Sequence, residues 1–210
     1  MSIKLAIWDW NGTLQNDARH FYEAGARRIF AHFGLACPDF DTHRRECQHD
    51  WLSYYHAKGV PADVGPEALN AILHQGLADL GPAPIFDDAL EIVEAFQDAH
   101  VINVLASGQV PHILTVEVGR HSFEFAAMIG GVKDKPAAFR ERMVAASAQP
   151  NETIVIGDMV NDAEAALAVG CRVYICPRGF HAPEHVLAAQ PRLPNMKVIA
   201  TLAGLRYLLL

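Results

Sequence analysis

The sequence predicts an α/β protein whose core is a doubly wound parallel sheet of the Rossmann-like type, with a small helical domain inserted near its start. Along most of the chain, short apolar runs alternate with amphipathic helical patterns, which is typical of parallel sheets covered by helices. Residues 16–84 break this alternation, because they carry helical patterns only. We therefore expect a core domain of residues 1–15 and 85–210 and an inserted helical domain of residues 16–84.

The first strand is predicted over Ile3–Trp8, a run that is almost entirely apolar and too short for a helix. It stops at Asp9, and open α/β sheets bind their ligands at the carboxyl ends of strands. Gly12 permits a tight turn close to an anion. Asp and Asn before Gly are also common in simple turns, which remains the alternative for this segment taken alone.

Three amphipathic helices are predicted in the inserted domain. The first ends at Gly34, the second covers residues 43–57, and the third begins at Pro66, which suits a first helical turn. Their apolar stripes are Tyr22, Ala26, Ile29, Phe30 and Phe33 in the first, Trp51, Leu52, Tyr54 and Tyr55 in the second, and Leu69, Ile72, Leu73, Gly76, Leu77 and Leu80 in the third. The segment Gly81–Pro84 then returns the chain to the core.

Strands and helices alternate through the rest of the chain. Four further strands are predicted at residues 101–106, 126–129, 153–156 and 172–175. The predicted helices are one that Asp87 can cap, with Ala89, Ile92, Val93 and Phe96 on one face, followed by residues 111–121, 136–147, 162–169 and 183–189 and a final helix from Thr201.

Composition excludes several classes of function. The 210 residues are 51% hydrophobic and 20% charged, as in a soluble globular protein with a sizeable core. The net charge of −7 gives no support for nucleic-acid binding. The start of the chain lacks the features of a signal peptide, no apolar run approaches the roughly 20 residues of a membrane helix, and the four cysteines form no Cys-x-x-Cys pair. We expect a cytoplasmic protein with reduced thiols and no membrane partner, whose oligomeric state the sequence does not indicate.

Four polar groups each follow a predicted strand. They are Asp9–Thr13, Ser107–Gly108, Lys135–Pro136 and Gly157–Asp162. Because the carboxyl ends of parallel strands meet at one edge of the sheet, these groups are expected to lie close together.

The order of these groups resembles the motifs of the haloacid dehalogenase-like (HAD) hydrolase superfamily. Asp-x-x-Gly-Thr, Ser-Gly, Lys-Pro and Gly-Asp-x-x-x-Asp occur in sequence, and the match covers nearly the whole chain. The resemblance implies a HAD core. In this superfamily a helical insertion between the first two motifs is the C1 type of cap, a lid over the active site. The chain is thus similar to subfamily I and to its phosphoglycolate phosphatase-like subgroup, which implies a small phosphorylated substrate.

Phosphoryl transfer needs a nucleophile, charge neutralisation and oriented donors, and these residue types can supply all three. Asp9 can attack phosphorus and form an aspartyl-phosphate. Asp9 and Asp158 offer the hard oxygen ligands that Mg²⁺ prefers, and the resemblance adds the backbone carbonyl of Asn11. Lys135 can compensate the charge of Asp9 and of the phosphoryl oxygens, while Asp162 is expected to orient the metal site from behind. The remaining phosphate contacts are expected from Ser107 and from residues Gly12, Thr13 and Gly108, mainly through backbone N–H groups.

Each of these residues also has a simpler interpretation. Ser107–Gly108 alone is a loop, and Asp158 and Asp162 can act as caps of the next helix. Lys133 competes with Lys135 as the site lysine, and the proline that follows favours Lys135 by resemblance. It is the series of four motifs in order that favours the metal and phosphate site.

Asn11 departs from the motif of the phosphatases that this chain resembles. Most phosphatases of the superfamily carry an aspartate at this position, which acts as general acid and base. An amide is neither a general acid nor a general base at neutral pH, and losing general acid–base help costs about 10²- to 10⁴-fold in rate. Three hypotheses remain: a phosphatase with Asn11 in place of the acid, a catalytically weakened HAD-fold protein that binds a phosphoryl ligand or a partner, and a non-phosphatase HAD hydrolase.

Polar and aromatic residues of the insertion are candidates for choosing the substrate, and a solvated helix face is the alternative for each. They are Arg27, Arg28, His43, Arg44, Arg45, His49, Tyr54 and His56. The eleven histidines show no spacing typical of metal ligands, since Pro183 separates His181 from His185.

Overall fold

The computed structural model describes residues 2–47 and 50–210, which form two compact units. The first unit consists of Met1–Asn16 and Ile85–Leu210, and the second is Asp17–Pro84. Within the described parts of the chain, no helix has both the length and the apolar character that a membrane crossing requires. None of the four cysteines is joined in a disulfide.

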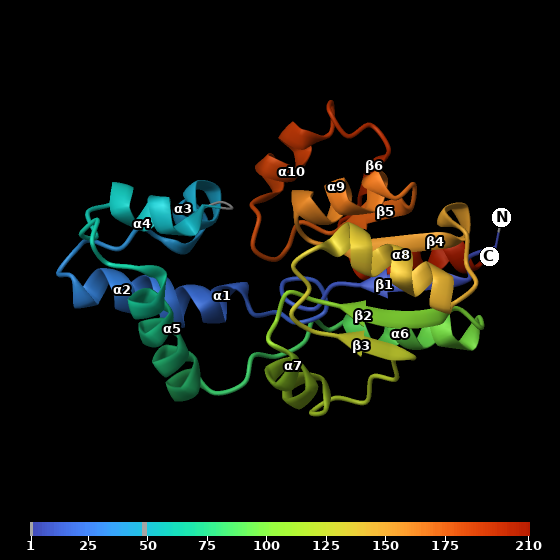
Figure 1. The fold of residues 1–210 in the computed structure, drawn as a ribbon, viewed down its shortest axis with the longest axis horizontal. Coiled ribbons are helices and arrows are strands. Elements are labelled where there is room, and N and C mark those ends of the chain that lie inside the picture. The colour runs from blue at the N-terminus through green and yellow to red at the C-terminus, as the bar shows by residue number, and fades with distance from the viewer. Residues whose placement is uncertain (1, 48–49) are drawn as a thin grey trace. The chain divides into compact units, whose positions relative to one another are not determined.

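The first unit is built on a six-stranded sheet in which every neighbouring pair is parallel (Figure 1). The strands are β1 (Leu5–Trp8), β2 (Ile102–Ala106), β3 (Ala127–Ile129), β4 (Thr153–Gly157), β5 (Arg172–Ile175) and β6 (Met196–Val198). Their spatial order is β3-β2-β1-β4-β5-β6. The predicted doubly wound α/β class is therefore confirmed.

Helices cover both faces of this sheet, so that its strands are apolar on both sides. One face packs on α6 (Ala89–Asp98), α7 (Pro111–Val118) and the 3₁₀ helix η3 (Leu202–Leu209), and the other on α8 (Lys135–Ala145), α9 (Val160–Ala168) and α10 (Pro183–Ala189). A 3₁₀ turn, η2 (Pro150–Glu152), precedes β4. Trp8 and Tyr174 belong to the first of these cores and Ile7 and Val155 to the second, as the alternation of a strand requires.

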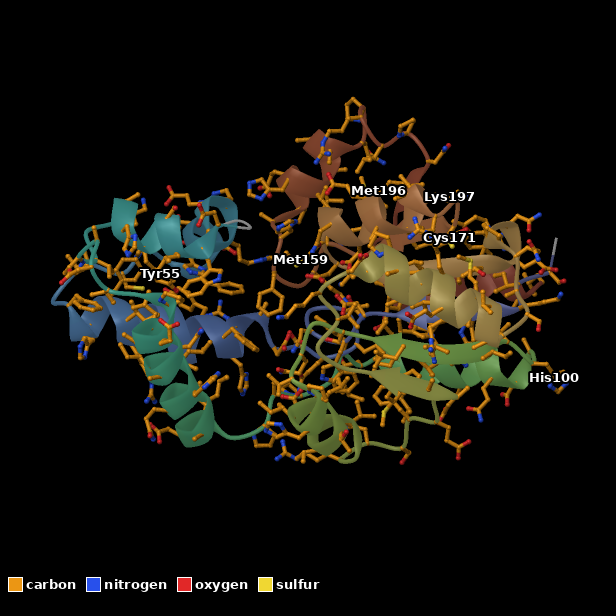
Figure 2. All side chains as sticks on the ribbon, viewed as in Figure 1. Tyr55, His100, Met159, Cys171, Met196 and Lys197 are labelled. Atoms are coloured by element: carbon orange, nitrogen blue, oxygen red, sulfur yellow. The ribbon has the colours of Figure 1, made fainter. Side chains whose placement is uncertain are left out.

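The order of the strands places the site at the centre of the sheet. From β1 the chain moves outward through β2 and β3 on one side and then through β4, β5 and β6 on the other. The carboxyl ends of β1 and β4 thus form the switch point at which α/β sheets bind ligands. Figure 2 shows Met159, which follows β4, at this end of the sheet and His100, which precedes β2, at the opposite end.

Three details of the core differ from the sequence prediction. The strand β6 was not predicted, because three residues at the edge of a sheet carry too little periodicity to detect. The final helix is a 3₁₀ helix. Asp88, not Asp87, precedes α6 as its N-cap residue, and its carboxylate accepts the N–H groups of Leu202 (2.8 Å) and Ala203 (3.3 Å) at the start of η3.

In the described residues of the second unit, 17–47 and 50–84, the regular secondary structure is helical. Its helices are α1 (Ala18–Phe21), the π-helical segment η1 (Tyr22–Ala26), α2 (Arg27–His32), α3 (Phe40–Glu46), α4 (Trp51–Ala57) and α5 (Pro66–Leu80). They enclose an aromatic core around Phe30, Tyr54 and Tyr55. Tyr55 is labelled in Figure 2.

The prediction of a single helix over residues 43–57 is wrong, because two helices, α3 and α4, occupy this region. Asp39 accepts the N–H of Thr42 at the start of α3, and Asp50 accepts that of Ser53 at the start of α4. These carboxylate caps begin new helices. The candidate His49 lies outside the described residues.

Gly76 of α5 packs directly against the backbone of η1. A Cβ atom there would lie 2.2 Å from the carbonyl oxygen of Ala24 and 2.7 Å from its Cα. Backbone atoms cannot rotate away, so we expect Gly76→Ala to force the two helices apart. On the scale of overpacked cores, the free energy of unfolding should fall by about 1–3 kcal/mol.

Urea denaturation followed by circular dichroism measures this loss of stability. Gly204→Ala is the matched control, because a Cβ at Gly204 meets no atom within 4 Å. A Gly76→Ala protein as stable as this control would contradict the close helix contact.

Candidate active site

The loop after β1 is held in a tight turn around one carbonyl group. The backbone oxygen of Trp10 accepts N–H groups from Thr13 (3.2 Å), Leu14 (3.0 Å) and Gln15 (2.9 Å). Gly12 has φ +71°, a conformation that favours glycine. The buried Trp10 indole donates to Glu117 Oε2 at 3.0 Å and so ties the loop to α7. We call residues 9–14 the β1 loop from here on.

Asp9 and Asp158 are neighbours because β1 and β4 are paired in register. Trp8 lies opposite Ile156, and the Asp9 N–H donates to the Ile156 carbonyl at 2.9 Å. Each strand is therefore followed directly by an aspartate, Asp9 after β1 and Asp158 after β4, at the same edge of the sheet. Asp162 joins them from the first turn of α9, where its Oδ2 accepts the N–H of Met159 at 3.0 Å. Carboxylate oxygens of Asp9, Asp158 and Asp162 lie within 4.8 Å of one another.

Lys135 is the cation of this cluster. Its Nζ lies 3.0 Å from Asp9 Oδ2 and 2.5 Å from Asp162 Oδ1. Asp134 fixes the start of α8 by accepting the N–H of Ala137 at 2.9 Å, so that Lys135 is the first helical residue. Lys133, the competing lysine of the sequence analysis, is exposed.

Burial sets the electrostatics of the cluster. It raises the pKa of Asp9 to about 6, although Lys135 opposes this shift, and it raises the pKa of Asp158 well above the ordinary value, with the charges of Asp162 and Asp9 adding to the effect. Burial alone would lower the pKa of Lys135, but the charges of Asp162 and Asp9 outweigh it and hold that pKa above its usual range. Three carboxyl groups and one ammonium group thus share a nearly dry site.

The donor set of this cluster fits a hard divalent cation. Mg²⁺ is bound through one or two carboxylates together with substrate oxygens, and Asp9 and Asp158 provide such carboxylates. A further positive charge would also oppose the burial and the repulsion that together raise their pKa values. Across residues 2–47 and 50–210, this is the one cluster of three or more acidic, histidine or cysteine side chains with such spacing.

Asn11 of the β1 loop is joined to Ser107 by a hydrogen bond. The Ser107 hydroxyl donates to Asn11 Oδ1 at 3.2 Å and accepts the N–H of Gln109 at 3.1 Å. Asn11 Nδ2 in turn donates to Gln15 Oε1 at 3.4 Å. Gly108 follows Ser107 in an exposed bend. The Asn11 side chain is therefore oriented by two partners.

Sequence reasoning missed the segment Arg178–Phe180, which follows β5. Its Phe180 N–H donates to Asp158 Oδ2 at 2.7 Å, and Arg178 Nη2 donates to the Thr13 carbonyl at 3.2 Å. The one available signal was its place after the fifth predicted strand, at the edge where the other site residues gather.

The candidates for substrate choice in the second unit are largely engaged locally. Arg27 pairs with Glu23, Arg28 pairs with Asp79, Arg45 donates to Thr42, and a ring nitrogen of His56 lies 3.0 Å from the Val64 carbonyl oxygen. Arg44 lies over the ring of Phe40. His43 packs edge-on against Tyr22 and Tyr54, and burial lowers its pKa to about 4, which makes it a neutral side chain at pH 7.

Lys135 offers a test of this electrostatic picture. Removing its charge by Lys135→Met leaves buried carboxylates uncompensated, and breaking a buried pair in this way costs about 3–5 kcal/mol. We expect a loss of that size in the free energy of unfolding, measured by urea denaturation without divalent cations. Lys133→Met, two residues away and exposed, is the control. Equal stability of the two variants would show that the ammonium group does not balance the cluster.

A parallel sheet with an acidic cluster and a largely buried lysine at its switch point is typical of α/β enzymes. The family model of haloacid dehalogenase-like hydrolases matches residues 3–170, and the chain belongs to this family of hydrolases.

Individual relatives agree with this assignment. The phosphoglycolate phosphatase of Thiobacillus denitrificans is 26% identical, with 86% of each chain covered. Among solved structures, a predicted phosphoglycolate phosphatase from Haemophilus somnus 129pt superposes with a TM-score of 0.77 at 17% identity, covering 98% of this chain and 97% of the other. CbbY from Rhodobacter sphaeroides, solved in complex with phosphate, has a TM-score of 0.69 at 16% identity, with 97% and 96% covered. At these identities the structural matches establish the fold.

Proposed function

We propose that the protein is a Mg²⁺-dependent phosphatase of a small phosphorylated metabolite and that it works through an aspartyl-phosphate on Asp9. The observation that carries this proposal is Lys135, whose ammonium group joins Asp9 to Asp162 beside the carboxylate of Asp158. The names of the Thiobacillus relative and of the Haemophilus structure support the substrate class. In this proposal Asp17–Pro84 is the cap domain that selects the substrate.

The first step places a negative nucleophile against a negative substrate. A carboxylate oxygen of Asp9 attacks phosphorus, the bond from phosphorus to the leaving oxygen breaks, and the alkoxide takes a proton from water. Lys135 offsets part of the charge during this step. We assign contacts to the phosphoryl oxygens to Ser107, Gly12, Thr13 and Gly108.

The second step regenerates the enzyme. Water attacks phosphorus, the bond between phosphorus and the Asp9 oxygen breaks, and inorganic phosphate leaves. Mg²⁺ bound by Asp9, Asp158 and the Asn11 carbonyl would neutralise phosphoryl charge in both steps. Asp162 holds Lys135, and Asn11 gives neither step a proton.

A panel of phosphate esters tests the proposal. Small alkyl phosphates, 2-phosphoglycolate and aryl phosphates are assayed for released phosphate in Mg²⁺ and after chelation of the metal. We expect hydrolysis that requires Mg²⁺ and that is faster with aryl esters, which leave without protonation. Hydrolysis that persists at the same rate in chelator would contradict the metal assignment.

Asn11 favours a second candidate, the binding of a phosphoryl ligand without turnover. Its amide is held by Ser107 and Gln15 and cannot act as an acid. In that case calorimetry would show inorganic phosphate binding in the presence of Mg²⁺, while no ester of the panel is hydrolysed.

A further inference from the structure

The segment Arg178–Phe180 lies directly on the β1 loop. A Cβ atom at Gly179 would lie 2.2 Å from Asp158 Oδ2, 2.5 Å from Gly12 Cα and 2.6 Å from the Gly12 carbonyl oxygen. Only a glycine permits this approach of two backbones. The segment lies beyond residue 170, where the family match ends. The family match therefore gives no information about this segment.

The two loops together fix the carboxylate of Asp158. The N–H of Phe180 donates to Oδ2 at 2.7 Å, and the hydroxyl of Thr13 lies 3.4 Å from Oδ1. Asp158 is completely buried, so no solvent competes for these contacts. With a donor on each oxygen, the orientation of the carboxylate depends on where Phe180 and Thr13 lie.

Arg178 fastens the segment to the loop beneath it. One guanidinium nitrogen donates to the Thr13 carbonyl at 3.2 Å, and another lies 2.7 Å from Asp88 Oδ1. The flat face of the guanidinium stacks on Phe86, with its carbon 3.7 Å from the ring centroid. This planar fork contacts three groups at once, which the single ammonium of a lysine does not reproduce. Asp88 is itself held in place by η3.

The geometry points to Arg178 as a positioning residue of the metal site. By clamping its segment on the β1 loop, Arg178 keeps the Phe180 N–H on Asp158 and so presents that carboxylate to Mg²⁺. Partners that orient metal ligands in this way typically change metal affinity by about 10- to 100-fold when they are removed. This inference rests on the proposed function, because it assigns Mg²⁺ to Asp158.

The experiment is a calorimetric titration of substrate-free protein with Mg²⁺. We compare the natural protein with Arg178→Met, which loses the whole fork, and with Arg178→Lys, which keeps a charge for Asp88. The dissociation constant should rise about 10-fold or more in Arg178→Met and by less in Arg178→Lys. Arg206→Met removes an exposed ion pair with Glu91 and should bind Mg²⁺ as the natural protein does.

Kinetics add a readout that a purely structural role would not move. At limiting Mg²⁺ the Arg178 variants should hydrolyse the ester more slowly than the natural protein does. Saturating Mg²⁺ should restore most of their kcat, with little change in the KM of the ester. Circular dichroism checks that each variant is folded, and Arg178→Lys decides the outcome if Arg178→Met does not fold.

Two negative outcomes are distinguishable. Folded Arg178 variants that bind Mg²⁺ as tightly as the natural protein would overturn the inference and leave the proposed function intact, since Arg178 would then only stabilise the fold. A natural protein that binds no Mg²⁺ would overturn the metal assignment itself and this inference with it.

Discussion

Asp9→Asn should abolish hydrolysis of phosphate esters, with a loss in kcat of about 10⁴-fold or more, as expected for removal of a nucleophile. An amide of nearly the same size keeps the oxygen that accepts the Trp10 N–H at 2.9 Å, so the loop should keep its shape. The amide cannot form the aspartyl-phosphate. The release of phosphate from the best ester of the panel, at saturating Mg²⁺, measures the loss.

The control for this variant is Asp98→Asn, which makes the same change at an exposed position at the end of α6. It should retain the full rate. Asp9→Asn protein that is folded and hydrolyses esters at more than contaminant level would remove the nucleophile assignment.

Asn11→Asp should raise the hydrolysis of simple alkyl phosphates by up to about 10²-fold, within the range that general acid–base catalysis supplies. The new carboxyl group can protonate the leaving alkoxide and then accept a proton from the attacking water. Ser107 can still donate to the new carboxylate. Asn11 Nδ2 now donates to Gln15 Oε1, and the Gln15 amide can flip so that its own N–H donates to the carboxylate oxygen that replaces this nitrogen. Aryl phosphates should gain less in the first step, because their leaving groups need no proton.

Two checks make this second result interpretable. Asn11 precedes Gly12, a pair prone to deamidation, so the intact mass of the natural protein must first exclude conversion to aspartate. Asn11→Ala is the matched variant that removes the amide without adding an acid, and it should show no gain. Unchanged or lower alkyl-phosphate hydrolysis in Asn11→Asp, with Mg²⁺ binding retained, would show that the missing acid does not limit the enzyme.

The sequence was sufficient for those parts of the fold that depend on repeated local patterns. Buried strands such as Leu5–Trp8 and helices such as Pro66–Leu80 stand out because several apolar residues recur with one period. The strand Met196–Val198 has only three residues. Its pairing with β5 in the folded sheet makes it a strand, because its own residues show no strand pattern. The π-helical turn Tyr22–Ala26 also leaves no trace in the apolar stripe of its helix.

The sequence predicted those residues of the candidate site that directly follow a strand. Asp9 and Asp158 follow neighbouring strands, so their proximity could be expected from the sheet alone. Arg178 is different, because its contacts with Thr13, Asp88 and Phe86 join residues far apart in the chain. No local pattern encodes such contacts, and they became visible only when the loops were placed in space.

Trapping the phosphorylated enzyme tests the central proposal most directly. The natural protein and Asn11→Asp are each mixed with an aryl phosphate and Mg²⁺ and quenched in acid within a single turnover. After digestion, mass spectrometry measures the mass of the peptide that contains Asp9. We predict the added mass of one phosphoryl group on Asp9. More of it should accumulate in the natural protein, because without a base the attack of water on the intermediate is slow. Ester hydrolysis with no phosphoryl group on Asp9 at any quench time would contradict the account.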